Sequence, residues 1–207
     1  MINENKLQDL QTGDILLFDS SDHWYDWLVK KWTTSYYSHS AMVLRNPSFL
    51  PQDKREGLYI IQSDKPDKID IEDNKHKFGV QIVPINDIFD SGYDKVFVRR
   101  LSTTRDENFD NLLSEVHKKV HDIPYDLNFK NWWIAGMYHI GLSKNMVKRH
   151  VNSFWCSALV CYLYRELQLI DQTIDWSNMA PSDLADDKFV TNKPSELKNV
   201  ELLYNFV

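Results

Sequence analysis

Two residues of the sequence have the chemistry of a thiol nucleophile and its base. Cys156 lies in FWCSALVCYLYREL, where apolar residues at helical spacing predict a helix over about 154–168 with Cys156 in its first turn. The positive end of a helix dipole stabilises a thiolate, and backbone N–H groups of the first turn can bind an oxyanion. His39 lies in YYSHSAMVL, at the start of an apolar strand that would hold the imidazole rigidly. A cysteine and a histidine from distant positions are the pair that a thiol hydrolase needs.

Each of these residues also has a purely structural interpretation. Free cysteine is most often buried and inert, and a histidine at a strand end can be a packed core residue. Cys161 lies mid-helix among Leu and Val, which favours the inert interpretation for this thiol. Five residues separate the two cysteines, about 140° around a helix, so they are poorly placed for a disulfide. Two free thiols predict a reducing compartment.

A histidine base needs a further polar group that fixes its tautomer. The predicted strand 59–62 ends at Gln62, and Asp64 follows two residues later. If this strand pairs with the strand predicted at 41–44, Gln62 would lie near His39. Gln62 can orient the imidazole through its carbonyl oxygen but carries no charge, whereas Asp64 carries a charge but lies toward the loop. The sequence leaves open which of the two completes the site.

Two other motifs have residue types that could bind a ligand. His117 and His121 are four residues apart on a predicted helix, which could bring both to one metal ion. Lys-Lys-Val separates them, no Glu follows the first His, and no third ligand is obvious, so both are expected on the solvated side. Thr12-Gly13-Asp14 could suggest phosphate binding, but the chain has six glycines and no GxxxxGK. We therefore expect no metal and no cofactor.

The elements that must position these residues follow from hydrophobic patterning. A helix over 107–121 has apolar residues at i, i+3, i+4, i+7 and i+11, and Pro124 ends it. The helix with Cys156 can be capped by Asn152 or Ser153. Further predicted elements are strands at 14–18, 41–44, 59–62, 80–83, 96–99 and 200–206, a helix at 22–32, and loops at 45–57 and 64–77. This order predicts an α+β fold, with a mainly antiparallel sheet packed with helices in a single domain over 1–207.

Composition excludes several classes of protein. The chain has 207 residues and a hydrophobic share of 43%, which is typical of a globular domain. Its net charge of -6 argues against nucleic acid as the main partner, although Lys144, Lys148 and Arg149 form a local basic cluster. The start, MINENKLQDL, has no apolar run typical of a signal peptide, and no stretch reaches the roughly 18 apolar residues of a membrane span. We expect a cytoplasmic protein, at most peripheral to a membrane; its Asn, Lys, Asp and Ile content is compatible with a virus or an intracellular bacterium.

Several short blocks occur in one order along the chain. They are GDILLF at 13–18, SHSAMVL at 38–44, GVQIVPIND at 79–87, VFVRRL at 96–101, PYDLNF at 124–129 and FWCSALV at 154–160. This series resembles the permuted papain-like cysteine hydrolases of NlpC type, in the branch with YiiX-like and YaeF-like bacterial proteins and poxvirus relatives. Lecithin:retinol acyltransferase is a more distant cousin. The resemblance covers about residues 10–187 and implies a circularly permuted papain-like fold, in which the histidine strand precedes the cysteine helix.

The resemblance also implies roles for particular residues. Cys156 matches the nucleophile and His39 the base, while Gln62 stands where the family often has Glu. That departure would weaken activity, shift its pH optimum or leave the role to Asp64. Tyr125 and Asp126 match a family block to which we assign a structural or supporting role. The implied reaction is hydrolysis or acyl transfer at an amide or ester, through a thioester intermediate.

The substrate expectation rests on aromatic residues near the two reactive positions. They are Trp24, Trp27 and Trp32 before the histidine strand, and Trp132, Trp133 and Tyr138 before the cysteine helix. If both groups flank the site, they form an apolar groove suited to acyl chains, and otherwise they fill the core. A lipid or acyl substrate is therefore favoured over a cell-wall peptide. Two alternatives remain: a catalytically weak relative that binds a lipid or peptide in the groove, and a cysteine peptidase acting on a protein or peptide tail. The sequence does not give the oligomeric state.

Overall fold

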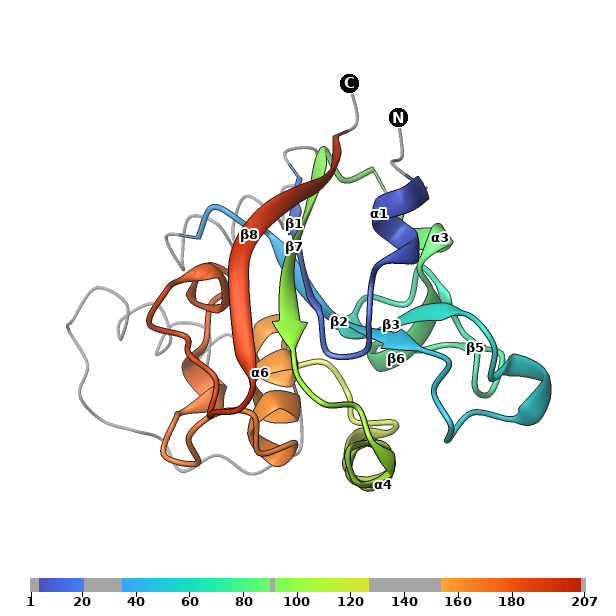
Figure 1. Cartoon of the computed structure of the whole chain (residues 1–207). Coiled ribbons are helices and arrows are strands. Elements are labelled where there is room, and N and C mark those ends of the chain that lie inside the picture. Colours follow the sequence, from blue (N-terminus) through green and yellow to red (C-terminus); the bar gives the residue numbers. More distant parts are fainter. Residues whose placement is uncertain (1–3, 21–34, 90–91, 127–153, 206–207) are drawn as a thin grey trace.

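The centre of the molecule is a six-stranded sheet (Figure 1). The computed structural model describes residues 4–20, 35–89, 92–126 and 154–205. The strand order is β6-β3-β2-β1-β7-β8, and every neighbouring pair is antiparallel. The strands are β1 (Ile15–Asp19), β2 (His39–Arg45), β3 (Leu58–Asp64), β6 (Gly79–Pro84), β7 (Lys95–Ser102) and β8 (Glu196–Asn205). The mainly antiparallel α+β architecture predicted from the sequence is confirmed.

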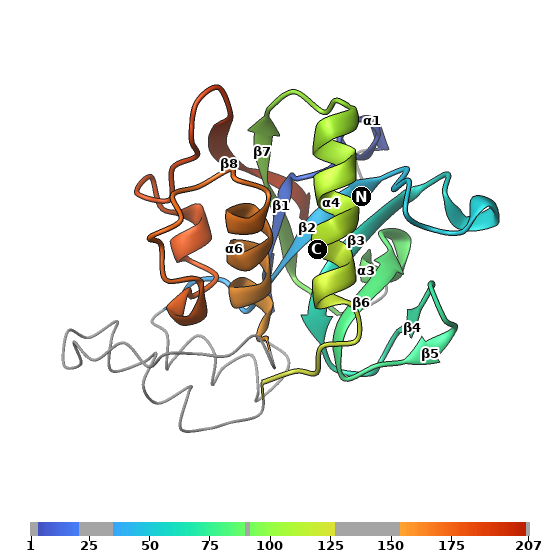
Figure 2. The same ribbon diagram turned by 90° about the horizontal axis from the view of Figure 1, so that it is seen from below.

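Helices cover both faces of this sheet. They are α1 (Glu4–Gln8), α3 (Asn86–Phe89), α4 (Glu107–Val120) and α6 (Cys156–Glu166), with single 3-10 turns η1 (Gln52–Lys54), η2 (Trp176–Asn178) and η3 (Asp183–Ala185). The two long helices, α4 and α6, lie side by side across one face (Figure 2). The short helices α1 and α3 contribute to the core on the opposite face. None of the helices in the described part of the chain has the length and apolar character needed to cross a bilayer.

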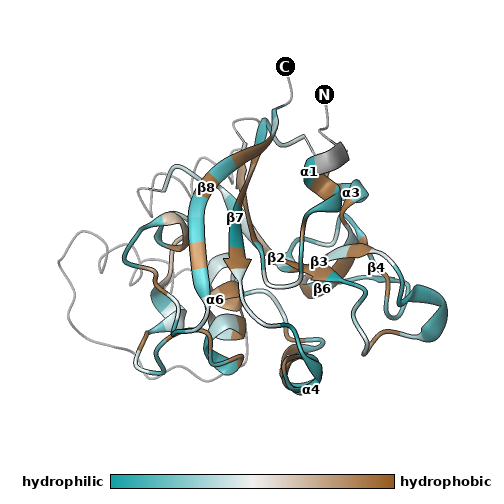
Figure 3. Ribbon diagram, viewed as in Figure 1, coloured by the Kyte–Doolittle hydropathy of each residue, from teal (hydrophilic) through white to brown (hydrophobic). Residues whose placement is uncertain are grey.

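Alternation along the strands builds the two cores. Ile15 and Leu17 of β1 pack into the core beneath α4 and α6, while Leu16 and Phe18 pack into the core on the other face. All four side chains are buried, so β1 reads as a continuous apolar run rather than an alternating one. In the hydropathy colouring, the edge strand β8 carries both hydrophilic and hydrophobic segments (Figure 3). A continuous apolar run therefore marks a strand that packs against a core on both of its faces.

Helix α4 forms where its periodicity predicts it. Asp106 is the N-cap, and its side chain accepts a hydrogen bond of 3.0 Å from the backbone N–H of Phe109. Phe109, Leu113 and Val116 are buried against the sheet, as the apolar spacing requires. The helix ends at Val120, close to the predicted end.

Two parts of the chain differ from the sequence prediction. The predicted loop 64–77 contains a small hairpin, β4 (Ile69–Asp70) and β5 (Lys75–His76). In β8 the predicted alternation breaks, because a register irregularity opposite Phe97 adds one residue to the strand. Leu202 is therefore 43% exposed, while the extra residue Leu203 is buried. The predicted helix 22–32 lies outside the described residues.

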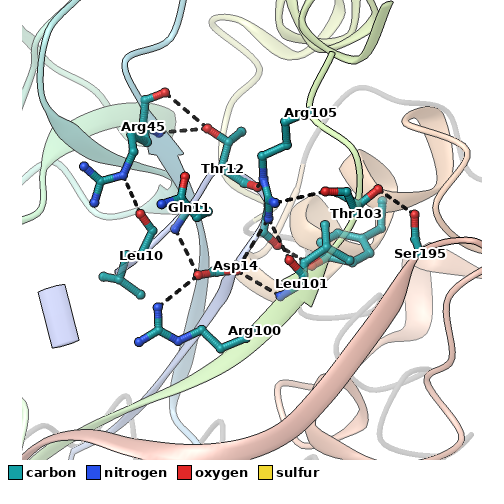
Figure 4. Close-up of polar contacts among 12 residues, drawn as sticks. Leu10, Gln11, Thr12, Asp14, Arg45, Arg100, Leu101, Thr103, Arg105 and Ser195 are labelled. Carbon is teal, nitrogen blue, oxygen red and sulfur yellow. Dashed lines mark hydrogen bonds and ion pairs between the residues drawn. The ribbon is translucent and has the colours of Figure 1, made fainter. Parts of the chain in front are cut away.

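A buried carboxylate fixes the start of β1 (Figure 4). Asp14 is 1% exposed and accepts hydrogen bonds from the backbone N–H groups of Gln11 and Leu101, at 3.0 and 2.9 Å. Its carboxylate also pairs with Arg100 at 3.5 Å and Arg105 at 3.8 Å. Burial raises the pKa of Asp14 and outweighs the hydrogen bonds and arginines, which lower it. The Thr12-Gly13-Asp14 segment is therefore satisfied by the protein itself.

The same corner connects to the helix that carries Cys156. The buried hydroxyl of Tyr164 in α6 donates a hydrogen bond to the carbonyl oxygen of Gly13. Gly13 has φ +94°, and a Cβ there would lie 2.6 Å from Cδ2 of Leu101. A glycine is thus required at this turn, which joins β1 to α6.

Candidate active site

His39 is the first residue of β2 and lies beside two aromatic rings, Phe18 and Tyr93, which also contact each other. It lies opposite Phe18 of β1 in the sheet register. The imidazole centroid is 5.3 Å from the ring of Phe18 and 6.2 Å from that of Tyr93, which stacks parallel to it with an interplanar angle of 8°. His39 is 6% exposed. The imidazole therefore has little contact with water, and the two rings contribute to its burial.

Strand β3 brings two polar side chains to this imidazole. It pairs with β2 as predicted, with Ile61 opposite Met42. Gln62 and Asp64 lie on the same face of β3, because they are two residues apart. Nε2 of His39 lies 2.9 Å from Oε1 of Gln62 and 4.0 Å from Oδ2 of Asp64. An amide oxygen only accepts, so Nε2 carries the hydrogen. Gln62 thus makes the orienting hydrogen bond, and Asp64 acts through its charge.

Cys156 is the first residue of α6. It is a free thiol, 5% exposed, and its side chain lies close enough to the imidazole of His39 to raise the pKa of that ring. Because Nε2 of His39 faces Gln62, Nδ1 is the ring nitrogen left for the sulfur. The N-cap of α6 is Trp155, which makes no side-chain capping bond. The predicted caps Asn152 and Ser153 are therefore wrong: the helix begins later than expected, and both residues lie outside the described residues.

The charges around His39 favour its protonated form. Burial, the largest single influence, lowers the pKa of His39, but the Asp64 carboxylate, the Cys156 side chain and the hydrogen bond with Gln62 together raise it to about 9. The imidazole is therefore cationic at neutral pH. A cationic imidazole beside a cysteine is the arrangement that stabilises a thiolate.

The chain entering α6 is fixed by hydrogen bonds to two other segments. Ser63 Oγ donates to the carbonyl oxygen of Phe154 at 2.7 Å, which joins this chain to the strand that carries Gln62. The backbone N–H of Asp126 donates to the same carbonyl at 3.1 Å, and Tyr125 forms an isolated parallel bridge with Phe154. Tyr125 and Asp126 are both buried. They lie where they can hold the start of the helix in place, and their supporting role at the site stays a prediction.

A turn that the sequence analysis did not single out connects the two halves of the site. The carbonyl oxygen of Met179 accepts hydrogen bonds from Trp155 Nε1 at 3.1 Å and Ser157 Oγ at 2.5 Å, on either side of Cys156. Three residues further on, Ser182 Oγ lies 2.8 Å from Ser35 Oγ, in the segment that leads into His39. This turn therefore fixes α6 relative to the strand that begins at His39.

Cys161 is unlike Cys156 in its surroundings. It is fully buried in the core, and burial raises the pKa of its thiol well above the ordinary value. A thiol that stays protonated is a poor nucleophile. This agrees with the inert interpretation given to Cys161.

The two histidines of α4 are placed differently from the prediction. His117 is buried, stacks on Phe49 at 4.1 Å, and bonds through Nε2 to Oε2 of Glu72 at 2.9 Å. His121 Nε2 lies 3.4 Å from the same oxygen. The prediction that both lie on the solvated side is wrong for His117, because Glu72 in the β4–β5 turn folds over it. Over the described ranges, no three or more His, Cys, Asp or Glu side chains are arranged to hold a metal ion.

The predicted apolar groove depends on six aromatic residues that lie outside the described residues. Trp132, Trp133 and Tyr138 lie outside the described residues. The same is true of the three tryptophans before the histidine strand, Trp24, Trp27 and Trp32. The groove stays a prediction.

Comparison with known proteins gives a fold relationship. No family model and no curated protein matches the sequence. Among solved structures, the chain is similar to YiiX from Escherichia coli O157:H7, described as a metalloprotein of the DUF1105 group. The two share 18% sequence identity and a TM-score of 0.50, over 95% of this chain and 97% of that one. The chain therefore has a YiiX-like fold.

Proposed function

We propose that this protein is a cysteine hydrolase or acyltransferase with a circularly permuted papain-like fold, acting on an amide or ester. One observation carries the proposal. Buried His39 contacts Cys156 through one side of its ring and Gln62 through the other, with the Asp64 charge 4.0 Å away. A nucleophile, a base and an orienting group in contact are what nucleophilic catalysis by a thiol requires.

The proposed reaction begins with the Cys156 proton on His39. The thiolate sulfur attacks the carbonyl carbon of the substrate and forms a C–S bond. As the C–N or C–O bond of the substrate breaks, the His39 imidazolium gives its Nδ1 proton to the leaving nitrogen or oxygen, which leaves a thioester and a neutral imidazole. His39 then takes a proton from water or from an acceptor alcohol or amine, whose attack breaks the C–S bond, releases the acyl group and regenerates the Cys156 thiolate beside the His39 imidazolium.

The first turn of α6 offers donors for the oxyanion of the tetrahedral intermediates. Trp155 leaves the helix without a side-chain cap. The N–H groups at the start of a helix lack intrahelical partners and lie at the positive end of its dipole. Such preorganised donors stabilise negative charge that develops on a carbonyl oxygen.

The residues at this site do not fit a metal centre. The Escherichia coli neighbour is described as a metalloprotein. Here Nε2 of His39 is bonded to the uncharged amide of Gln62, which leaves that nitrogen without a free lone pair for a metal ion. At the separate cluster on α4, Glu72 is the ion-pair partner of His117 and His121. No step of the proposed reaction is therefore assigned to a metal.

A lipid or other acyl substrate, with peripheral contact to a membrane, is the favoured form of this proposal. It rests on the aromatic residues near both reactive positions in the sequence. The neutral third residue, Gln62, favours one alternative: a catalytically weak relative that binds a lipid or peptide in the same place. The enzyme and the weak relative differ in whether Cys156 forms a thioester with the bound substrate and releases it again.

The reactivity of Cys156 tests the proposal directly. Iodoacetamide alkylation would be followed against pH in a Cys161→Ala background, so that a single thiol reports, with and without His39→Ala. We expect rapid alkylation of Cys156 near pH 7 in the wild type and much slower alkylation in His39→Ala. Acyl esters of increasing chain length and short peptides would then be screened, with mass spectrometry for a thioester on Cys156. An ordinary thiol titration that is unchanged by His39→Ala would contradict the catalytic assignment.

A further inference from the structure

The amide at Gln62 raises a problem that a carboxylate would not. Both oxygens of a carboxylate accept, so its orientation toward a histidine is immaterial. A carboxamide has an accepting end and a donating end, and only the accepting end supports a hydrogen on Nε2 of His39. If the amide were reversed, its NH₂ would donate to Nε2, and the hydrogen of a neutral imidazole would move to Nδ1, the nitrogen that must accept protons.

This choice matters when His39 is neutral. The imidazolium donates from both nitrogens and itself selects the carbonyl end of Gln62. After the leaving group has taken the proton, the ring has one hydrogen, and the Gln62 amide can be satisfied in either orientation. An additional contact must then hold the amide.

Gln81 is placed to make that contact. It lies directly opposite Gln62 in the antiparallel pairing of β3 and β6. Side chains of directly opposed residues leave the same face, with Cβ atoms about 4.5–5.5 Å apart, so two glutamines can reach one another. Both side chains are almost fully buried, Gln62 at 2% and Gln81 at 0% exposed.

The orientation of Gln81 is itself fixed. Its Nε2 donates to the backbone carbonyl oxygen of Lys65 at 3.0 Å, and a carbonyl can only accept. The accepting Oε1 of Gln81 and the donating Nε2 of Gln62 are both buried without a hydrogen-bond partner among the described residues. A buried donor and a buried acceptor on opposed side chains are complementary, and leaving both unpaired is costly.

We propose that Gln81 is a positioning residue, which accepts a hydrogen bond from Gln62 Nε2 and thereby keeps the Gln62 carbonyl toward His39. The hydrogen-bonded series runs from the Lys65 carbonyl through Gln81 and Gln62 to Nε2 of His39. It selects the imidazole tautomer with its free nitrogen toward Cys156. This inference rests on the proposed function for its catalytic meaning but not for its structural test.

The test is the tautomer of His39, read from the nitrogen chemical shifts of ¹⁵N-labelled protein at pH 10, above the His39 pKa of about 9. Cys156 is first alkylated with iodoacetamide in every sample, because a thiolate beside Nδ1 would itself attract the hydrogen. We then expect the wild type to carry the hydrogen on Nε2. Gln81→Met, which removes both the donor and the acceptor, should give a substantial population with the hydrogen on Nδ1. Gln81→Glu, which keeps an acceptor toward Gln62, should retain the hydrogen on Nε2.

Val83→Ala is the matched control, because Val83 lies on β6, shares a face with Gln81, and is buried. It weakens the packing of the same strand without changing a polar group, so the tautomer should not move. If Gln81→Met does not fold, Gln81→Asn withdraws the acceptor by one methylene and should show the same shift. The proposal is overturned if the tautomer of His39 is unchanged in Gln81→Met or, where that variant does not fold, in Gln81→Asn. It is also overturned if Val83→Ala changes the tautomer equally. Alkylation of Cys156 in the same samples separates this outcome from failure of the catalytic assignment, which would show as an ordinary thiol in the wild type.

Discussion

Replacing Asp64 by asparagine should remove most of the charge that keeps His39 protonated. Oδ2 of Asp64 lies 4.0 Å from Nε2 of His39, and its side chain is 17% exposed. Two unit charges at that distance interact by about 4 kcal/mol at an effective dielectric constant of about 20, which corresponds to about 3 pKa units. Because burial lowers the pKa of His39, Asp64→Asn should bring that pKa from about 9 to about 6 or below.

The titration of the His39 ring by NMR measures this change directly. Asp67→Asn is the matched control, since this neighbouring carboxylate is 55% exposed and pairs with Lys65 at 2.8 Å. It should leave the His39 midpoint near that of the wild type. In Asp64→Asn, the alkylation rate of Cys156 near pH 7 should fall as the cationic imidazole is lost. A His39 midpoint that stays near 9 in Asp64→Asn would refute the assignment of the charge to Asp64.

Three further predictions concern stability. The raised pKa of His39 contributes stability that is complete below about pH 6.5 and is lost as pH rises through about 9. In urea unfolding, the free-energy loss caused by His39→Gln should therefore be about 3 kcal/mol larger at pH 6 than at pH 10. An equal loss at both pH values would contradict this. Tyr164→Phe orphans the Gly13 carbonyl and should cost about 1–3 kcal/mol in the same assay, whereas no change would show the bond to be dispensable. Gly79→Ala places a Cβ 2.4 Å from the backbone oxygen of Ile123 at a residue with φ +146°. It should lower the free energy of unfolding by about 2–4 kcal/mol and the melting temperature by several degrees. An unchanged melting temperature would argue against this close approach.

The sheet and the two long helices could be predicted because their side chains are buried in regular patterns. The apolar run at Leu16 and the helical spacing from Phe109 to Val120 each reflect contact with a core. The β4–β5 hairpin could not be predicted, since its strands are two residues long and mostly polar. The exposure of Leu202 depends on a bulge set by pairing with β7, which no local pattern in β8 encodes.

The candidate site was predictable where its residues sit on apolar elements. His39 and Gln62 end up in contact because the strands that carry them were assigned correctly and pair as neighbours. Tyr93 and Met179 were not predictable, since a ring above the imidazole and a carbonyl beside the nucleophile helix arise from tertiary packing. The importance of Gln81 could have been predicted from the sequence. A glutamine inside the otherwise apolar segment GVQIVP indicates a buried polar group that needs a partner.

The carbonyl oxygen of Phe154 has a consequence for how local opening would spread through this part of the molecule. The backbone N–H of Asp126 and Oγ of Ser63 both donate to this one oxygen, and Tyr125 forms a bridge with the same residue. A local opening at Phe154 would therefore release the start of α6 from β3 and from the segment that follows α4 in one event.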